Sequence, residues 1–350
     1  MINNYSVSYY TKENFPSLKS AWKLLEKGDD MTYYQSYDWY EYLNEYYVPD
    51  DTANYISIYV VLEKNGEIVL IAPLWIVKHT FRWVNKKGIY FLGREGWSDY
   101  LNFIYNVFDG DALLFLLNDV CNKYKVYNYK LSELRKDVQS LKYLSNKFEV
   151  ICRELETCVS LKIPETLEKY NQILSKNARQ NVRTAQNRLK KDGIDVRIEF
   201  DDKDVNRDRC REIREQRFVK KFQKRSGLRK LKQNIGWRLT YHFRQYLPFY
   251  SYDKGCFLSL YHGENLCSFF YYLKDDIHRK VIVMAAGVNI DYSRYSPGIV
   301  SLNAFIKNLI EFDNVDEIDF TRGNEPYKYA VGGTEHFIET ISFKIDKIFL

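Results

Sequence analysis

Residues 287–333 read GVNIDYSRYSPGIVSLNAFIKNLIEFDNVDEIDFTRGNEPYKYAVGG. This stretch alternates strand and helix signals and ends in a polar loop. The apolar run Ile282–Val288 leads into it and predicts a buried strand. Ser296 and Pro297 have the form of a helix start, with serine as the N-cap and proline at the first helical position. The helix that follows has one apolar face, made by Ile299, Leu302, Ile306 and Leu309. Val315–Thr321 predicts the next strand, so the stretch predicts a strand–helix–strand unit.

The polar loop Asp319–Tyr329 begins at the end of that second strand. A helix N-terminus beside a strand end is suited to bind anions, because unpaired N–H groups and the helix dipole both point outward. The loop adds carboxyl, cationic and phenolic side chains to this position. The combination predicts group transfer from a donor that carries phosphate.

Residues Tyr292–Lys328 resemble the second half of the FemAB-like acyltransferases of the GNAT superfamily, and are most similar to the CelD-type branch of these bacterial enzymes. The segment LSKNARQNVR, residues 174–183, is similar to the basic helix of that family. IAPL at 71–74, FLG at 91–93 and DY at 99–100 are similar to its N-terminal half. The resemblance spans roughly residues 30–345. It implies an α/β (α+β) fold of tandem duplicated GNAT-like domains, each a mixed, mostly antiparallel sheet flanked by helices.

The resemblance also implies an acyl-coenzyme A co-substrate, with acetyl-coenzyme A as the expected donor. GNAT enzymes hold the coenzyme A pyrophosphate on main-chain amides where a strand passes into a helix, usually with a glycine-rich Q/RxxGxG/A loop. RYSPGI, residues 294–299, fills that place here with one of the glycines, and Pro297 has no N–H to donate. Acyl-coenzyme A and aminoacyl-tRNA therefore both stay open as donors. The residues expected to bind the donor are Ser296, Gly298, Ile299 and Arg322.

Acyl transfer to an amine passes through an oxyanion and requires removal of a proton. Lys328 or Arg322 would supply positive charge to the oxyanion or to substrate phosphates. Glu325 or Asp319 would act as the base, and Tyr327 would donate a hydrogen bond. For Asp319 a structural alternative has equal weight, in which its carboxylate pairs with Arg322 or Lys328 and fixes the strand end.

Three cations, Lys176, Arg179 and Arg183, lie along one side of a predicted helix that Ser175 caps and Gly193 ends. They are expected to reach phosphates of the donor or acceptor, although a solvated helix face explains any one of them as well. Asp99 and Tyr100 are placed like the edge of an acceptor site. The first half has no equivalent of the Arg322–Lys328 loop, so it is expected to be a degenerate half that shapes the acceptor cleft.

A length of 350 residues suggests two domains, and the expected division is 1–155 and 156–350. The second domain would carry basic helices at 175–192 and 205–246. Two strand-like pairs enclose Asn65-Gly66-Glu67 and His262-Gly263-Glu264, with an offset of 197 in both Gly and Glu. The recurrence of this hairpin pattern in each half predicts an internal duplication.

Residues 203–232 hold thirteen Lys and Arg against four Asp and Glu, a local charge of +9 in a chain of net charge +6. The block indicates a polyanionic partner or, alternatively, a solvated helix face. No apolar run approaches a membrane span, and the first residues do not resemble a signal peptide, so a cytoplasmic protein is expected. The six cysteines and five histidines show no metal-ligand spacing; no metal and reduced core thiols are expected.

The leading functional prediction is an N-acyltransferase that uses acyl-coenzyme A. Its acceptor would be an amino sugar, an amino-acid-like amine or a nucleotide-linked precursor of cell-surface polysaccharide. One alternative is an aminoacyl-tRNA-dependent transferase that builds peptidoglycan bridges, which would make tRNA a partner. A third hypothesis is a non-catalytic protein that binds anionic ligands.

Overall fold

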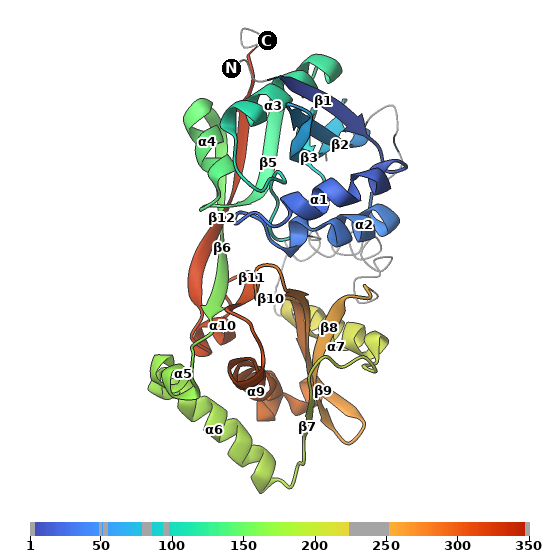
Figure 1. Cartoon of the computed structure of the whole chain (residues 1–350). Helices are drawn as coiled ribbons and strands as arrows, with labels where there is room; N and C mark the ends of the chain where they lie inside the picture. The colour runs from blue at the N-terminus through green and yellow to red at the C-terminus, as the bar shows by residue number, and fades with distance from the viewer. Residues whose placement is uncertain are drawn as a thin grey trace. The chain divides into compact units, whose positions relative to one another are not determined.

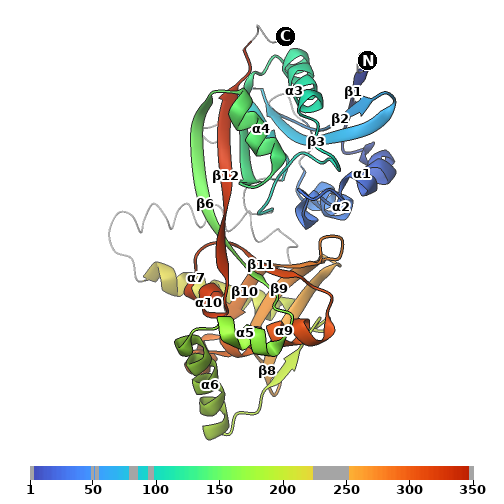
Figure 2. The ribbon, with the colours of Figure 1, turned by 60° about the vertical axis from the view of Figure 1, so that its left-hand side comes forward.

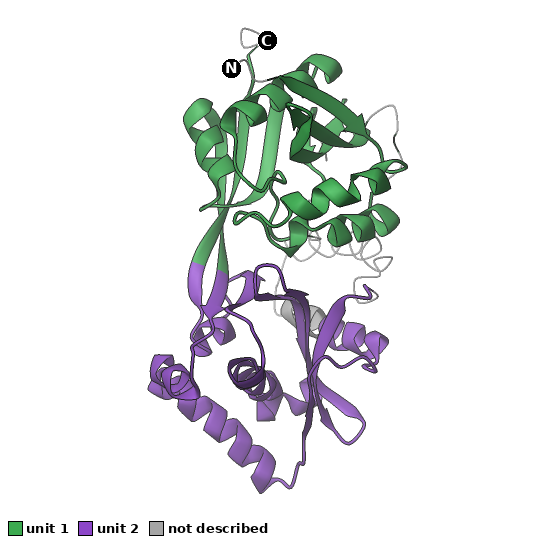
Figure 3. Cartoon of the chain, in the orientation of Figure 1, with its two compact units in different colours: residues 1–158, 336–350 green, residues 159–335 purple. Residues whose placement is uncertain are grey.

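The computed structural model describes residues 4–48, 51, 55–78, 86–93, 98–223 and 252–346, with no side chains described for 217–223. Most of the predicted helix 205–246 and the part of the basic block beyond residue 216 lie outside this description, apart from the main chain to residue 223. The chain divides into two compact units, residues 1–158 with 336–350 and residues 159–335 (Figure 3).

Unit 1 is built on a mostly antiparallel sheet, in which the fourth and fifth strands of the order are parallel to each other. The strand order is β1 (Tyr5–Tyr10), β2 (Tyr55–Lys64), β3 (Glu67–Val77), β4 (Gly88–Phe91), β5 (Asn128–Arg135) and β12 (Thr334–Lys344). Its helices are α1 (Lys19–Leu25), α2 (Tyr37–Tyr46), α3 (Gly110–Tyr124) and α4 (Gln139–Lys147), with short turns η1 (Phe15–Leu18) and η2 (Tyr33–Gln35).

Aromatic side chains from η1, α1 and α2 fill the space between these elements and β2. The Phe15 ring stacks on Tyr37 at 4.7 Å, and Trp22 packs against Tyr40 at 5.1 Å. The Tyr59 ring of β2 lies 4.8 Å from Phe15. Large rings of this kind bury much apolar area each, so this cluster stabilises the attachment of the N-terminal helices to the sheet.

Unit 2 repeats the arrangement. Its strand order is the end of β6 (Val150–Lys162, of which residues 159–162 lie in unit 2), β11 (Glu317–Arg322), β10 (Lys280–Val288), β9 (Asn265–Asp275), β8 (Gly255–His262) and β7 (Arg197–Glu199). β10 and β11 are parallel, and the pairs from β10 to β7 are antiparallel. Its helices are α5 (Leu167–Ile173), α6 (Lys176–Lys191), α7 (Arg207–Gln223), α9 (Pro297–Phe312) and α10 (Pro326–Ala330), with the turn η4 (Ile290–Tyr295).

Helices cover both faces of the unit 2 sheet, as Figure 1 shows for α9 and α7. Side chains alternate along each strand. Leu258 and Tyr272 point into the core shared with α5 and α9, whereas Phe257 and Tyr271 point into the core shared with α7. A Cβ at Gly287 would meet Ile213 Cγ2 of α7 at 3.0 Å, so this glycine permits the close approach of helix and strand.

The order of elements is the same in both units. Each has a hairpin, an antiparallel third strand, a helix and a parallel fourth strand: β2, β3, β4, α3 and β5 in unit 1, and β8, β9, β10, α9 and β11 in unit 2. The predicted fold class of mixed, mostly antiparallel sheets flanked by helices is confirmed. The two-residue turns are Asn65-Gly66 and Gly263-Glu264. The two hairpins therefore align with an offset one residue larger than the 197 obtained by matching Gly66 with Gly263.

The final strands are exchanged between the two repeats. β12, which ends the second repeat, pairs with β5 and completes the sheet of unit 1. In the strand order β6 of the first repeat follows β12, and Figure 2 shows these two strands side by side. For this reason residues 336–350 group with unit 1, whereas the sequence analysis kept them in the second domain. Within unit 1, the buried Glu339 carboxylate of β12 accepts from Arg153 of β6 at 2.6 Å.

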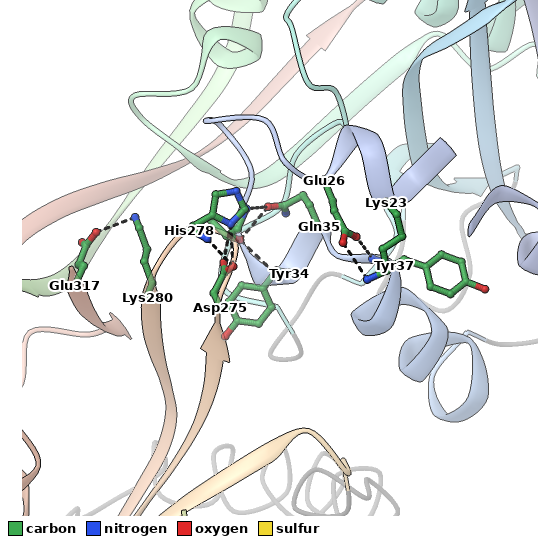
Figure 4. A network of polar contacts seen from close by, with 10 residues as sticks. Lys23, Glu26, Tyr34, Gln35, Tyr37, Asp275, His278, Lys280 and Glu317 are labelled. Atoms are coloured by element: carbon green, nitrogen blue, oxygen red, sulfur yellow. Dashed lines mark hydrogen bonds and ion pairs between the residues drawn. The ribbon is translucent and has the colours of Figure 1, made fainter. Parts of the chain in front are cut away.

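Polar contacts fix strand and helix ends inside each unit (Figure 4). In unit 1 the buried carboxylate of Glu26 accepts from Lys23 Nζ at 2.9 Å and from the Tyr37 main-chain N–H at 2.7 Å, which joins α1 to the start of α2. In unit 2 Lys280 and Glu317 form an ion pair of 2.8 Å at the first residue pair of the β10–β11 ladder. This pair marks the register from which the two parallel strands begin.

Candidate active site

β10 and β11 share only a short ladder, which pairs Lys280–Ile282 with Glu317–Asp319. β10 runs on to Val288 and β11 to Arg322, so both parallel strands continue past the ladder toward one edge of the sheet. α9, which connects them, begins at that edge with Pro297. In open α/β sheets ligands bind beyond the carboxyl ends of such strands, at the N-termini of the connecting helices. This edge is the candidate active site.

Thr321 links the two strands beyond their ladder. Its hydroxyl donates to the Val283 carbonyl at 3.2 Å, next to the point where β10 shifts register against β9. Its main chain is left-handed, with φ of 56°, a rare conformation for a β-branched residue. Its N–H donates to Asp319 Oδ1 at 2.7 Å. Side-chain hydrogen bonds thus satisfy groups that a continued ladder would have paired, and the strands are free to part.

The buried carboxylate of Asp319 has a contact that explains its position in an apolar strand, because it accepts the Thr321 N–H inside the turn. This contact agrees with a structural role for Asp319 at the strand end, and Thr321 is one of its partners. A role for Asp319 as the base stays a prediction.

Lys328 is the buried cation of the site, with only 2% of its surface exposed. Its ammonium donates to the main-chain carbonyls of Thr321, Arg322 and Gly323 at 3.2, 2.7 and 2.9 Å. Glu325 Oε2 lies 3.1 Å away. Burial of an ammonium is costly unless oxygens surround it, and four do here. Lys328 therefore holds the end of β11 in place; direct contact with an oxyanion stays a prediction.

Glu325 lies at the N-cap position of α10 without a side-chain capping bond, and its side chain is 41% exposed. It is therefore partly accessible and ion-paired with Lys328, and its role as the base stays a prediction. Tyr327 is half-buried, with its ring 6.3 Å from those of Phe270 and Phe320. Arg322, at the last position of β11, is also partly exposed. The structure thus gathers all five predicted loop residues around the end of β11.

The start of α9 holds the other predicted donor residues. Ser296 is the N-cap by position, with a left-handed φ of 50°, but its side chain makes no capping bond, which corrects the expectation of a serine cap. Its carbonyl accepts from the Ile299 N–H at 3.0 Å, so that amide is used within the helix. A Cβ on Gly298 would meet Val288 Cγ2 at 3.0 Å. Glycine at 298 therefore lets the helix start close to the end of β10.

Contacts on two sides hold the turn η4, which leads into Ser296. On one side, Asn289 at the start of the turn bonds to β9: its N–H donates to the Cys267 carbonyl at 2.9 Å, and its Nδ2 donates to the Leu266 carbonyl at 3.2 Å. From the β8 hairpin, His262 Nδ1 lies 3.2 Å from the Tyr292 hydroxyl. The loop between β10 and α9 is thus built into the sheet edge.

The C-terminal end of α6 contacts the same turn from another direction. Arg188 donates to the Arg294 carbonyl at 3.0 Å. The Asp192 carboxylate accepts from the Tyr295 hydroxyl at 2.9 Å and lies 3.3 Å from the Arg294 guanidinium. The hydrogen bond to Asp192 raises the pKa of Tyr295 above its usual value.

α6 begins as predicted, because Ser175 accepts the Ala178 N–H at 3.1 Å. Lys176 and Arg183 are exposed on it. Arg179 instead donates to the carbonyls of Asn171 and Leu174 at 2.6 Å each, which caps the C-terminal end of α5. The Arg179 guanidinium is thus already bonded to main-chain carbonyls, and its predicted contact with substrate phosphate stays a prediction.

Asp99 and Tyr100 lie in unit 1, whereas every other predicted site residue lies in unit 2. Tyr100 is 2% exposed, and its hydroxyl lies 2.9 Å from His336 Nε2 of β12. Its carbonyl accepts from Gln35 Nε2 at 2.9 Å. These contacts place Tyr100 in the framework of unit 1, so its predicted contact with an acceptor stays a prediction.

Sequence reasoning missed Thr321, Asn289, Arg188 and Asp192. Asn289 carries a signal that could have been used, since an Asn that follows a strand commonly turns the chain by bonding its own neighbours. It does so here by accepting the Asp291 N–H at 3.1 Å. The other three act through tertiary contacts that no local pattern reveals.

Three properties of the described residues bear on the remaining expectations. Five of the six cysteines are buried and all six are free; Cys152 is exposed, so the expectation of core thiols is wrong at that position. Within the described ranges, no group of three or more His, Cys, Asp or Glu is arranged to hold a metal ion. None of the helices in those ranges combines the length and hydropathy needed to cross a membrane.

The residues that form this edge match a known protein family. Residues 176–329 match the family model described as an acetyltransferase (GNAT) domain, which covers less than half of the chain. That range includes α6, the donor-side turn η4, the start of α9 and the β11–α10 loop. No curated protein matches the sequence significantly.

Solved structures match over nearly the whole length. FemX covers 95% of this chain and 96% of its own, with 11% identity and a TM-score of 0.52. A conserved protein of unknown function from Bacteroides thetaiotaomicron VPI-5482 covers 98% and 100%, with 10% identity and a TM-score of 0.56. A tandem GNAT protein from the clavulanic acid biosynthesis pathway covers 97% and 98%, with 7% identity and a TM-score of 0.48. At these identities the matches to FemX and to the Bacteroides protein show likeness of fold alone.

The family match and the geometry agree on the same edge of unit 2. A parted pair of parallel strands, the helix start between them and a loop with a carboxylate and cations all lie within the matched residues. Residues 176–329 therefore match an acetyltransferase (GNAT) domain, and the chain as a whole has a fold like that of FemX.

Proposed function

We propose that unit 2 transfers an acyl group, with acetyl as the first choice, from coenzyme A to an amine. The acceptor class is an amino sugar or a nucleotide-linked precursor of cell-surface polysaccharide, and the enzyme acts in the cytoplasm. The observation that carries the proposal is the parting of β10 and β11 beyond their three-residue ladder, with the start of α9 beside it. A GNAT domain implies an acyl-coenzyme A co-substrate, and this edge offers a helix N-terminus to its phosphates.

The acceptor nitrogen attacks the thioester carbonyl carbon directly. The oxyanion that forms collapses, the carbon–sulfur bond breaks, and coenzyme A leaves as a thiolate that takes up a proton. The amine loses one proton, for which Glu325 is the proposed acceptor because it is the accessible carboxylate of the loop. Lys328 and Arg322 supply positive charge near the end of β11, and Tyr327 supplies a hydrogen-bond donor. Asp319 is assigned to the shape of the turn.

Donor binding is assigned to the main chain and side chains at Ser296, Gly298, Ile299 and Arg322. Lys176 and Arg183, exposed on α6, are proposed to contact phosphate of the donor or acceptor, with Arg179 in a supporting position. Asp99 and Tyr100 of unit 1 are proposed to shape the acceptor cleft. No metal takes part in this scheme.

A thermal-shift titration with coenzyme A and acetyl-coenzyme A tests the donor. Ligand at 100 times its dissociation constant stabilises the folded state by about 2.7 kcal/mol, which raises the Tm of a domain of this size by about 5–11 °C, at about 2–4 °C per kcal/mol. Wild-type protein that shows no saturable shift at millimolar ligand contradicts the proposal. A positive result is followed by a panel of amino sugars and their nucleotide-linked forms, with mass spectrometry of the acylated product.

One observation favours a second candidate, aminoacyl-tRNA as the donor. α6 carries six Lys and Arg and no Asp or Glu among its sixteen residues, and most of its side chains are exposed. A phosphodiester backbone that contacts four of these cations gives an affinity whose logarithm falls with log salt at a slope of about −3 to −4. Filter binding of charged tRNA between 50 and 200 mM salt (about a fourfold range) tests this slope. Absence of binding at the lowest salt removes the candidate.

A further inference from the structure

The last turn of α6 is joined to the donor-side turn η4 by three contacts, two of them made by one carboxylate. Asp192 accepts the Tyr295 hydroxyl at 2.9 Å and pairs with Arg294 at 3.3 Å. Arg188, one turn earlier, donates to the Arg294 carbonyl at 3.0 Å. All of these partners immediately precede Ser296, where the chain becomes left-handed and α9 begins.

A capping bond from its own side chain does not hold Ser296 in place. Its side chain makes no capping bond, and a left-handed serine costs about 1 kcal/mol or more relative to an ordinary conformation. Pro297 fixes only the following residue. The conformation of the chain at the entry to α9 is thus held by neighbours, and the residues directly before it are held by α6.

α6 is itself firmly attached to the core of unit 2. Ala185 and Leu189 pack with Leu260 and Cys267 of the sheet and with Val300 of α9. Arg188 and Asp192 flank that apolar contact in sequence, so their polar groups extend from a fixed base. The main chain of Asp192 is fixed as well, because its N–H donates to the Arg188 carbonyl at 3.1 Å.

We infer that Asp192 and Arg188 are positioning residues for donor binding, which preorganise the η4 turn and the first amides of α9. The inference rests on the proposed function, in which this helix start receives the phosphates of acyl-coenzyme A. Preorganisation lowers the free energy lost when a loop becomes ordered on binding. Loss of the Asp192 contacts therefore weakens donor binding and leaves the chemical step at β11 unchanged.

The test compares Asp192→Ala with Asp195→Ala, which removes an exposed carboxylate three residues further on. Asp192→Ala is expected to raise the KM for acetyl-coenzyme A by about 5–20-fold, the effect of losing a hydrogen bond to a charged group, with kcat within about twofold. Tyr295→Phe, which removes a single hydroxyl, is expected to give a smaller rise. Asp192→Asn keeps an acceptor for Tyr295 and is expected to recover part of the affinity. Asp195→Ala is expected to match wild type.

Hydrogen exchange of the protein without ligand supplies an independent readout. Asp192→Ala is expected to speed amide exchange in residues 290–300 and leave the β11–α10 loop unchanged. Equal KM values and equal exchange in the Asp192 and Asp195 variants overturn the inference alone. Wild-type protein that binds no coenzyme A overturns the proposed function as well, so the two failures are distinguishable.

Discussion

The hydroxyl of Thr321 donates to the carbonyl of Val283 at 3.2 Å, across two parallel strands that have just left their shared ladder. The contact is a side-chain substitute for a ladder bond, made by a residue with a left-handed main chain. It holds β11 to β10 just beyond the end of the ladder.

Thr321→Ala is expected to destabilise the protein by about 1–2 kcal/mol, because the buried Val283 carbonyl loses its donor. Thr321→Ser keeps the hydroxyl and adopts the left-handed conformation more readily, so it should remain close to wild type. Denaturant unfolding of the two variants checks the difference. Equal stabilities would show that the hydrogen bond does not hold the strands.

Lys328→Met is expected to destabilise by about 2–3 kcal/mol, since three buried carbonyls lose their donor together. Acyl transfer should fall with it, because the end of β11 is no longer fixed. Lys169→Ala, which breaks an exposed ion pair with Glu165, is the matched control and should change stability by less than about 0.5 kcal/mol. A Lys328→Met protein with unchanged Tm would remove the positioning role.

Glu325→Gln is expected to lower kcat by about 10²–10⁴-fold, the usual contribution of a general base. Stability should fall by only about 1 kcal/mol or less, because the side chain is 41% exposed and glutamine keeps an oxygen for the Lys328 ammonium. The measurement is a pH–rate profile with saturating acetyl-coenzyme A. Loss of the acidic limb in the variant supports Glu325 as the base, and an unaltered profile assigns the proton to another group.

Gly298→Ala is expected to weaken coenzyme A binding by about 3–10-fold, because the new methyl meets Val288 Cγ2 and moves the start of α9. Val288→Ala removes that atom, so the double variant should recover part of the affinity. Isothermal titration of wild type, both single variants and the double variant gives the coupling. Additive effects would show that Gly298 is not packed against Val288 in solution.

Asp201, a left-handed residue after β7, accepts from the Tyr272 hydroxyl and from Lys274 Nζ at 2.7 Å each. Burial acts to raise the pKa of Asp201, but the hydrogen bonds from Lys274 and Tyr272 outweigh it and hold the pKa below its usual value. A carboxyl whose pKa is lower in the folded than in the unfolded chain stabilises the folded state at pH values above its unfolded pKa of about 3.9. This stabilisation is lost as the pH falls through the pKa of the folded state.

Asp201→Asn should therefore be less stable than wild type by about 1 kcal/mol at pH 7, a figure reduced for the exposure of the carboxylate. The difference should be constant to roughly pH 5 and shrink below about pH 4. Unfolding at several pH values checks it, with the exposed Asp276→Asn as the control. If the difference in unfolding free energy between wild type and Asp201→Asn stays the same at low pH, it does not arise from the charge of Asp201.

The sequence was informative where local chemistry decides structure. Ser175 caps α6, Pro297 begins α9 and the apolar periodicity of α9 faces the sheet, as predicted. It was uninformative where the outcome depends on distant partners. Nothing local shows that Lys328 turns inward to three carbonyls, that Arg179 caps α5, or that Tyr100 meets His336. The exchange of β6 and β12 was also missed, because strand partners are chosen by the whole sheet.

The exchanged strand has a consequence for the order in which the protein takes shape. β12 completes the sheet of unit 1, yet its residues follow those of unit 2 in the chain. During synthesis this strand emerges only after unit 2, so the sheet of the first repeat can be completed only then. The nascent first repeat must wait with the β5 edge uncovered, and an uncovered edge is open to pairing with other chains. Truncations that spare all of unit 2 and remove only residues after 335 should therefore lower soluble yield more than their length suggests.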